Sequence, residues 1–439
     1  MKQNRVNAVL KNMESMNLSQ ILITDPLAIF YLTGRMIKPF ERFYALYLNQ
    51  NGNHKIFINQ LETVPEDLGV EKVRFTDSDP YLDLVIKAID CKEPLGIDKN
   101  MAARFLLPLL DGKAGSGFVN ASLVLDQARA VKDTQEQELM RKASKLNDMA
   151  MSEIIRFFKE GVTETELAEQ LKKIYRDLGA DGLSFEPLFA FGENAASGHH
   201  WPDQTKLKPG DCIVADIGCT WEGYCSDMTR TYFYKEVTNH QQEVYNLVLK
   251  ANEEAEKAVA PGVSLSSLDQ IARGIITEQG YGAAFTHRLG HFIGLEAHEF
   301  GDVSSASTGQ AVAGNIFSIE PGVYLEKDMG VRIEDLVLVT EQGYECSVLC
   351  RRFFGTEIDF SMHKPNDLWH TKKGILMKQN PIATIIFSNG GKVQMELYPD
   401  IAPNAVTSFI YLAKQGVYDH YPIERIVPGW VLDMSYHAF

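Results

Sequence analysis

The sequence of 439 residues lacks several features that would place it in a special class of protein. No apolar run approaches the roughly 20 residues that a membrane-spanning helix needs. The first residues lead into an amphipathic helix pattern rather than the apolar core of a signal peptide. The six cysteines form no CxxC pair and no disulfide framework, which is typical of a reducing compartment. We therefore expect a cytoplasmic protein with no membrane partner.

Basic charge is also scarce. The chain has 43 lysine and arginine residues against 58 aspartate and glutamate residues, a net charge of −15. Because nucleic acids and anionic membranes are bound by basic patches that neutralise phosphates, this balance argues against both as partners. The apolar fraction of 45% and the charged fraction of 23% are those of an ordinary globular protein. The length alone suggests about three domains.

Composition and patterning divide the chain into four segments. They are an N-terminal domain, a repeat-containing domain, a polar linker where the acidic balance of charge ends, and a C-terminal segment, at residues 1–128, 129–360, 361–377 and 378–439. In the first segment, short apolar runs alternate with amphipathic ones, which predicts an α/β domain. Its expected strands are residues 21–24, 45–48 and 55–58, and its expected helices are residues 81–89 and 103–110.

The second segment contains an internal repeat. Gly-Val-Thr at 161–163 recurs 101 positions later as Gly-Val-Ser at 262–264. In each copy a Thr or Ser is placed to cap a helix that stops at a glycine, and strand-like runs follow. These runs are residues 211–218 and 224–233 in the first copy, and 315–320 and 331–339 in the second. The repeat predicts two helix–helix–hairpin halves related by a pseudo-two-fold axis, although two unrelated stretches with chance spacing remain the alternative.

The two predicted hairpins carry four carboxylates. Asp216 and Asp227 belong to the first hairpin, and Glu320 and Glu334 to the second. Buried carboxylates are costly unless they are paired or bound to metal, and symmetry would bring these four together. Their charge balances two divalent ions. Taken singly, each would more often be a residue at a sheet edge or a strand end.

Residues 286–299 add histidines that could supply a nitrogen ligand. Oxygen-rich ligation with one imidazole suits Mn²⁺, with Co²⁺, Fe²⁺ or Zn²⁺ as alternatives. Two neighbouring divalent ions can activate water and polarise a carbonyl, which is a route to amide hydrolysis.

Five motifs in and between these hairpins resemble those of one metallopeptidase family, that of prolidase, aminopeptidase P, creatinase and methionine aminopeptidase. They are Asp-Ile-Gly at 216–218, Ser-Asp-Met-Thr-Arg-Thr at 226–231, Gly-His-x-Ile-Gly-Leu-x-x-His-Glu at 290–299, Ile-Glu-Pro-Gly-Val-Tyr at 319–324 and Val-Arg-Ile-Glu-Asp at 331–335. The resemblance covers residues 130–358 and implies the pita-bread fold there. It also implies a creatinase-type N-terminal domain before it.

The resemblance implies five metal ligands. It assigns Asp216 to one metal ion, His291 and Glu320 to the other, and Asp227 and Glu334 to a bridging position between both. Glu320 is also expected to act as general base. All five residues are intact, whereas non-catalytic relatives have lost such ligands, so the resemblance argues against a pure binding role.

The resemblance also implies substrate-side residues. His199 matches a histidine of the substrate pocket, and His298 matches one that contacts the scissile amide and the proline side. His287 and Arg332 fit supporting and substrate-stabilising roles. The neighbouring His200 matches no position of the family, and we expect it at the surface.

The sequence departs from the family pattern at three places. Phe292 replaces the usual glycine after the ligand histidine, and Gly198 replaces the usual proline before the pocket histidine. Residues 300–319 contain no arginine or lysine, although prolidases often place a carboxylate-binding arginine there. Because a dipeptide presents its carboxylate on the proline itself, we expect longer Xaa-Pro peptides to be cleaved at least as well.

The sequence therefore predicts a metal-dependent peptidase that hydrolyses the bond between an N-terminal residue and proline, either as an Xaa-Pro dipeptidase or as an Xaa-Pro aminopeptidase. Its expected partners are small peptides with proline at the second position and a second copy of the chain in a homodimer. One alternative is a hydrolase of a small non-peptide amide on the same fold. Another is a prolyl-isomerase or binding fusion whose peptidase domain is vestigial.

Residues 378–439 resemble the N-terminal part of a cyclophilin-type prolyl isomerase. Arg425 matches that family's catalytic arginine, but the usual Gln-Gly-Gly segment reads Asp-Met-Ser at 433–435. We expect an incomplete β-barrel segment without isomerase activity, left by a truncated fusion. An unclosed barrel would expose sheet edges.

Overall fold

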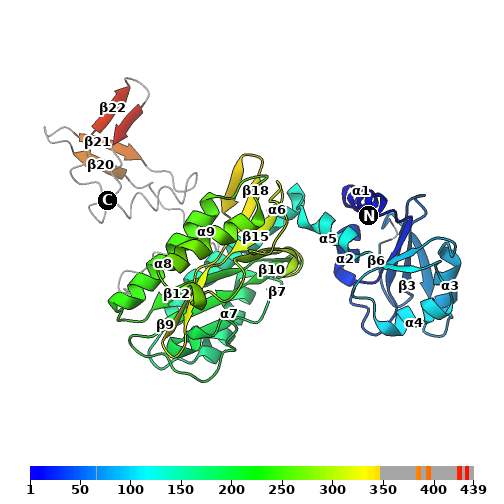
Figure 1. Ribbon diagram of the computed structural model, residues 1–439, viewed down its shortest axis with the longest axis horizontal. Helices are drawn as coiled ribbons and strands as arrows, with labels where there is room; N and C mark the ends of the chain where they lie inside the picture. The colour runs from blue at the N-terminus through cyan, green and yellow to red at the C-terminus, as the bar shows by residue number, and fades with distance from the viewer. Residues whose placement is uncertain (66, 347–381, 387–391, 397–422, 428–430, 435–439) are drawn as a thin grey trace. The chain divides into compact units, whose positions relative to one another are not determined.

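The computed structural model describes residues 1–65, 67–346, 382–386, 392–396, 423–427 and 431–434 (Figure 1). The chain divides into two units, residues 1–360 and residues 361–439. Within the described ranges, no helix combines the length and the apolar character that crossing a membrane requires.

The N-terminal domain is a mixed six-stranded sheet in the order β4-β3-β2-β1-β5-β6. The strands are β1 (Gln20–Ile23), β2 (Ala45–Asn49), β3 (Lys55–Asn59), β4 (Glu71–Phe75), β5 (Leu95–Ile97) and β6 (Phe118–Asn120). The helices are α1 (Gln3–Ser15), α2 (Pro26–Thr33), α3 (Tyr81–Ala88), α4 (Ala103–Asp111) and α5 (Ser122–Ala130). The predicted strands and helices of this segment are all present.

Alternation along the strands produces two hydrophobic cores, one on each face of this sheet. Ile21 and Ile23 pack in the core that α1, α2 and α5 share, and Leu22 between them packs in the core that α3 and α4 share. Successive side chains of a strand point to opposite faces, so a strand that is apolar throughout requires cover on both. The domain is therefore a three-layer α/β/α structure.

The described part of the second domain contains four long helices, two main antiparallel sheets and two smaller ones (Figure 1). The helices are α6 (Thr134–Ile154), α7 (Glu164–Leu178), α8 (Asn239–Lys257) and α9 (Leu265–Glu278). One sheet has the order β12-β9-β8, from β8 (Leu188–Phe191), β9 (Cys212–Ile217) and β12 (Met228–Phe233). The other has the order β14-β13-β15-β18-β19, from β13 (Gly290–Phe292), β14 (Glu299–Val303), β15 (Ile316–Ile319), β18 (Asp335–Thr340) and β19 (Gly343–Cys346).

Shorter elements complete this domain. They are β7 (Gly182–Leu183), β10 (Cys219–Trp221), β11 (Tyr224–Cys225), β16 (Gly322–Leu325), β17 (Met329–Arg332) and the 3₁₀ turns η1 (Ile155–Phe157), η2 (Gly192–Ala196) and η3 (Gly282–Ala284). Strands β16 and β17 form a separate antiparallel hairpin.

The predicted pseudo-two-fold repeat is visible in matching contacts. Asn147 of α6 donates a hydrogen bond to the carbonyl of Ile217 at the end of β9, at 2.9 Å, and Asn252 of α8 makes the same bond to Ile319 at the end of β15, also at 2.9 Å. Each bond joins a helix to the end of the strand that carries Asp216 or precedes Glu320. The two halves therefore use the same device at equivalent places.

The expected helix caps hold in one half only. Thr163 accepts a hydrogen bond from the backbone of α7 and forms a capping box with Glu166. Ser264 precedes α9, but within the described structure no hydrogen bond joins its hydroxyl to the backbone of that helix. Its hydroxyl lies 2.8 Å from that of Ser266 instead. The prediction of a serine cap was therefore wrong in its contacts, although the helix begins where expected.

The C-terminal unit contains two described hairpins. Strand β20 (Ile382–Ile386) pairs antiparallel with β21 (Lys392–Glu396), and β22 (Ile423–Val427) pairs antiparallel with β23 (Val431–Met434). Arg425 lies in β22, and Asp433 lies opposite it in β23. The predicted linker, residues 361–377, lies outside the described residues.

Candidate metal centre

The carboxylates lie where strands end or break. Asp216 is the only one of the four inside a strand, the penultimate residue of β9. Asp227 lies between β11 and β12, Glu320 directly follows β15, and Glu334 lies between β17 and β18. The sequence predicted continuous strands over 224–233 and 331–339, and this was wrong, because each strand is interrupted at its carboxylate. An interruption releases the side chain from strict alternation and lets it turn inward.

The side chains from the two halves meet around His291, which lies in β13. Its Nε2 atom lies 3.4 Å from Oε1 of Glu320, 3.6 Å from Oδ2 of Asp227 and 4.0 Å from Oε1 of Glu334. Ligand atoms of Asp227, His291 and Glu334 all lie within 4.8 Å of one another, and all three residues are buried.

These carboxylates repel one another electrostatically. Burial, reinforced by the charges of Glu334 and Asp216, raises the pKa of Asp227 well above its usual value. Burial and the charges of Glu320 and Asp216 do the same to the pKa of Glu334. Burial raises the pKa of Glu320 to about 7, with Asp216 adding to the shift and Arg332 opposing it. A cluster of this kind is stable in ionised form only with compensating positive charge.

Two buried oxygens of the cluster are left over. Oδ1 of Asp216 and Oε1 of Glu334 have no hydrogen-bond partner among the described residues. The second oxygen of each carboxylate is engaged, by Nη2 of Arg332 at 2.7 Å and by the hydroxyl of Thr229 at 2.8 Å. Buried polar atoms almost always have a hydrogen-bond partner. Unpaired oxygens that lie close to other potential ligand atoms are therefore suitable for binding a metal ion. The five predicted ligands are therefore a chemically suitable set for divalent cations.

His291 is prepared as a neutral nitrogen donor. Burial first, and then the neighbouring imidazole of His298, lower its pKa to about 3. Its Nδ1 lies 3.2 Å from the carbonyl of Phe292, which makes Nδ1 the protonated nitrogen and leaves the lone pair of Nε2 toward the carboxylates. Close packing of Gly290 under the backbone of Ser318 sets the position of this strand.

Arg332 and His287 meet at Tyr324, a residue for which the sequence indicated no role. Nη1 of Arg332 donates to the Tyr324 hydroxyl at 2.8 Å, and that hydroxyl lies 2.9 Å from Nε2 of His287. The Nδ1 of His287 lies 2.7 Å from the carbonyl of Arg288, so the tyrosine hydroxyl donates to Nε2. Burial and the charge of Arg332 lower the pKa of His287 to about 4, which keeps the ring neutral.

His298 and His199 are the other two histidines near the cluster. The ring of His298 lies 3.9 Å, centroid to centroid, from that of His291. Its pKa is lowered by burial first and then by Arg288, with a smaller contribution from His199. His199 is exposed. Arg288, which sequence reasoning passed over, is thus a cation close to the centre.

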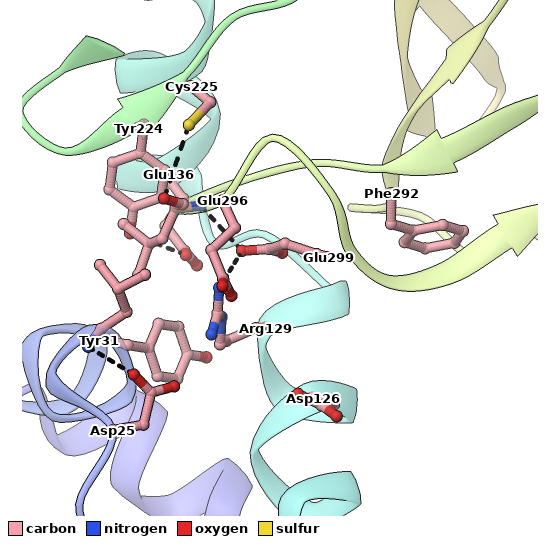
Figure 2. A network of polar contacts seen from close by, with 12 residues as sticks. Asp25, Tyr31, Asp126, Arg129, Glu136, Tyr224, Cys225, Phe292, Glu296 and Glu299 are labelled. Atoms are coloured by element: carbon pink, nitrogen blue, oxygen red, sulfur yellow. Dashed lines mark hydrogen bonds and ion pairs between the residues drawn. The ribbon is translucent and has the colours of Figure 1, made fainter. Parts of the chain in front are cut away.

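The loop that carries His298 is fastened by a buried ion network, and Figure 2 shows Glu296 and Glu299 converging on Arg129 of α5. Nη2 of Arg129 lies 2.6 Å from Oε1 of Glu299 and 2.8 Å from Oε2 of Glu296. Lys132 lies 3.0 Å from the other oxygen of Glu299. A cavity of about 270 Å³ opens beside this network. It is lined by Lys99, Asn100, Asp126, Arg129, Glu296, His298, Glu299 and Phe300.

The prediction that His200 is a surface residue was wrong. Its side chain is 15% exposed, and its Nε2 lies 2.6 Å from Oε2 of the fully buried Glu164. A histidine with no place in a motif gave no signal of this contact, because its partner lies 36 positions earlier in the chain.

Comparison with known proteins agrees with this geometry. Residues 138–341 match the model of metallopeptidase family M24, and residues 5–131 match that of the creatinase/prolidase N-terminal domain. An uncharacterised peptidase of Staphylococcus aureus (strain MW2) is 34% identical over 352 residues, which are 78% of this chain and 97% of that protein. The chain belongs to metallopeptidase family M24.

Solved structures of several peptidases share the architecture. A prolidase from Thermococcus sibiricus is 30% identical and superposes with a TM-score of 0.76, covering 81% of this chain and 98% of its own. The dipeptidase PepE from Mycobacterium ulcerans is 32% identical, with a TM-score of 0.75 and coverage of 80% and 97%. An X-Pro aminopeptidase from Thermotoga maritima is 28% identical, with a TM-score of 0.71 and coverage of 78% and 99%. The predicted creatinase-type and pita-bread domains are thereby confirmed.

The C-terminal resemblance is also confirmed. Residues 382–436 match the model of the cyclophilin type peptidyl-prolyl cis-trans isomerase family. The chain thus contains an M24 metallopeptidase region followed by a segment, residues 382–436, that matches part of a second family.

Proposed function

We propose that this M24 protein hydrolyses the bond between an N-terminal residue and a proline, and that two divalent metal ions, Mn²⁺ first among the candidates, serve the reaction. The observation that carries the proposal is the convergence of five donors, two with unpaired buried oxygens, in a chain similar to a prolidase, a dipeptidase and an X-Pro aminopeptidase. Asp216, Asp227, His291, Glu320 and Glu334 would hold the ions. When bound, the ions would activate water and polarise the scissile carbonyl.

The protein's own residues have separate tasks in this proposal. Glu320, which accepts a hydrogen bond from the Ser318 hydroxyl at 3.0 Å, would accept a proton from the attacking water. His298 lies beside the ligand His291 and contacts the scissile amide. Tyr324 orients neutral His287, whose neutrality avoids adding a second buried cation beside Arg332.

The proposed peptide length preference is supported by how Arg332, one of the cations near the centre, is used. Arg332 already bonds to Asp216, Tyr324, Thr229 and the carbonyl of Gly198, which leaves it poorly placed to take a dipeptide's carboxylate. We further propose that the part of a longer peptide beyond the proline extends toward the cavity beside His298. Both points support the expectation that longer Xaa-Pro peptides are cleaved at least as well as dipeptides.

A paired activity assay tests the proposal. The full chain, loaded with Mn²⁺, is given an Xaa-Pro dipeptide, an Xaa-Pro-Yaa tripeptide and the matching peptides with alanine in place of proline. We expect cleavage of both proline peptides, and loss of metal and activity in Asp227→Asn but not in Asp177→Asn, an exposed aspartate of α7. A dipeptide kcat/KM at least about tenfold higher (about 1.4 kcal/mol) would refute the length preference.

Other results would refute more. If no proline peptide were cleaved and a small non-peptide amide were, the fold would serve a different hydrolase reaction. If Asp227→Asn left hydrolysis unchanged, the metal centre itself would be rejected. The proposed homodimer is tested separately, because light scattering of a dimer would give about twice the chain mass of 49.3 kDa.

A further inference from the structure

Glu164, the first residue of α7, is completely buried and accepts four hydrogen bonds. Its Oε1 atom accepts from the backbone N–H of Phe191 at 2.8 Å and from Nδ2 of Asn194 at 3.0 Å. Its Oε2 atom accepts from Nε2 of His200 at 2.6 Å and from the backbone N–H of Asp203 at 3.0 Å. All four donors belong to one segment, residues 191–203, which also carries His199.

The carboxylate is not needed to start the helix. The capping box of Thr163 and Glu166 already satisfies the first turn of α7, and the backbone N–H of Glu164 itself bonds to the carbonyl of Thr205. A charge in the first turn would also interact favourably with the helix dipole from an exposed position. Complete burial therefore requires another reason.

The cluster is also unsuited to a cation. Glu164, His200 and Asp203 have ligand atoms within 4.8 Å of one another, which is the spacing of a possible metal site. A carboxylate offers about four lone-pair positions, and the four donors to Glu164 occupy them. The group is an anchor for the segment rather than a ligand for an ion.

His199 lies between two anchored neighbours. On one side, the carbonyl of Gly198 accepts from Nη1 of Arg332 at 3.1 Å, and on the other, the ring of His200 is held by Glu164. His199 itself is exposed, so its own side chain does little to hold it in place. Its position relative to the metal centre is therefore set by the residues before and after it.

We propose that Glu164 is a positioning residue of this enzyme, whose carboxylate holds the segment 191–203 in place and so holds His199 toward the substrate. The inference rests on the proposed function, because the family resemblance assigns His199 to the substrate pocket of an enzyme with that function. Glu164→Gln keeps the size of the side chain but turns an NH₂ group toward donors, so up to two of the four hydrogen bonds are lost.

Hydrogen exchange of the metal-loaded full chain tests the anchoring directly. We expect faster amide exchange in 191–203 in Glu164→Gln than in the wild type, with no change in α8 and α9. Glu169→Gln is the matched control, because Glu169 lies on the same helix, is exposed and, among the described residues, forms an ion pair with Lys172 alone. Unchanged exchange in 191–203 would overturn the inference. If Glu164→Gln does not fold, His200→Ala removes a single donor and is expected to show the same local change, smaller in size.

A double-mutant cycle tests the route through His199. We expect kcat/KM for an Xaa-Pro tripeptide to fall on the order of 10-fold to 100-fold in Glu164→Gln, since small misplacements of substrate-positioning groups have effects of this size. In a His199→Ala background, Glu164→Gln should have no further effect, with metal content unchanged throughout. Additive losses would show that Glu164 acts on activity by another route, and would refute the inference.

The two proposals can fail separately. A wild-type chain that cleaves no Xaa-Pro peptide overturns the proposed function, and hydrogen exchange still decides whether Glu164 anchors the segment. If Glu164→Gln cleaves such peptides as well as the wild type does, only the inference about Glu164 is overturned.

Discussion

Replacing Glu299 by glutamine should strongly destabilise the enzyme, although the change removes a single charge. The Glu299 side chain is 4% exposed and lies between Arg129 and Lys132, whose side chains are 6% and 1% exposed. The backbone N–H of Leu295 also donates to Glu299, at 2.9 Å. Glutamine would leave the buried Lys132 without its counter-charge and Arg129 paired with the more exposed Glu296, beside the loop that carries His298.

The size of the effect can be worked from the structure. Burial alone would raise the pKa of Glu299, but the charges of Lys132 and Arg129 overcome it and lower the pKa from its usual 4.5 to about 2. At about 1.36 kcal/mol for each pKa unit, the ionised form gains about 3 kcal/mol on folding. Breaking a buried ion pair by removing one partner costs about 3–5 kcal/mol. We therefore expect Glu299→Gln to cost about 3–5 kcal/mol at pH 7.

Glu296→Gln is the matched control, because it removes a carboxylate that contacts the same nitrogen of Arg129. The Glu296 side chain is 42% exposed, and pairs of this exposure contribute at most about 1 kcal/mol. Thermal unfolding of both variants, followed by circular dichroism, gives the comparison. At roughly 2 °C for each kcal/mol in a large domain, the midpoint should fall by about 6–10 °C in Glu299→Gln and by about 2 °C or less in Glu296→Gln.

The pH dependence has a definite sign. Because the folded pKa of Glu299 is lowered, its contribution is complete above the unfolded value of 4.5 and is lost as the pH falls toward about 2. The stability gap between wild type and Glu299→Gln should therefore be constant from pH 7 to about pH 5 and narrow below pH 4.5. Equal midpoints for the two variants, or a gap that widens in acid, would refute the reasoning.

Two further substitutions test the centre itself. In Gly290→Ala the added Cβ would meet the backbone carbonyl of Ser318, so we expect lower thermal stability and lower metal content. Gly274→Ala, in α9 with open space around it, should instead gain about 0.5–1 kcal/mol, and equal effects of the two would contradict the packing argument. Tyr324→Phe removes the hydroxyl that orients His287, so kcat should fall on the order of tenfold or more while metal content, measured by atomic absorption, stays at the wild-type level. Wild-type kcat in Tyr324→Phe would show that His287 needs no such orientation.

Local pattern carried much of the fold prediction. Apolar runs such as residues 21–24 and 45–48 became β1 and β2, because a strand buried on both faces must be apolar at every position. The glycines at 161 and 262 both adopt positive φ, 83° and 84°, where the repeat predicts helix boundaries. Such features depend on neighbours close in sequence, and a sequence displays those neighbours directly.

The candidate site could be predicted in composition but not in contacts. The motifs bring Asp216, Asp227, His291, Glu320 and Glu334 to attention, and the structure brings these residues together. Their roles as ligands stay predictions. The interruption of β-structure at two of them was not predicted, because apolar residues on both sides of a carboxylate favour a continuous strand.

The charged residue Glu164, in the first turn of a helix, shows what sequence analysis could not predict. From sequence alone Glu164 is an ordinary residue that favours a helix N-terminus, since its neighbours show only a capping motif. Its four donors lie 27 to 39 positions later and become neighbours only when the segment after β8 folds back over α7. The same is true of Glu299, whose cations come from the end of α5 and the residues after it, 167 and 170 positions earlier.

The sequence by itself determined the α/β class, the repeat and the donor set, because periodicity, helix boundaries and ligand chemistry are written in residues near one another. The tertiary structure alone decided which polar groups are satisfied and which are left for a metal. Whether a buried carboxylate is an anchor, as Glu164 is, or a candidate ligand, as Glu334 is, depends on the donors that folding brings to it from distant segments. Those donors have no fixed spacing in the chain.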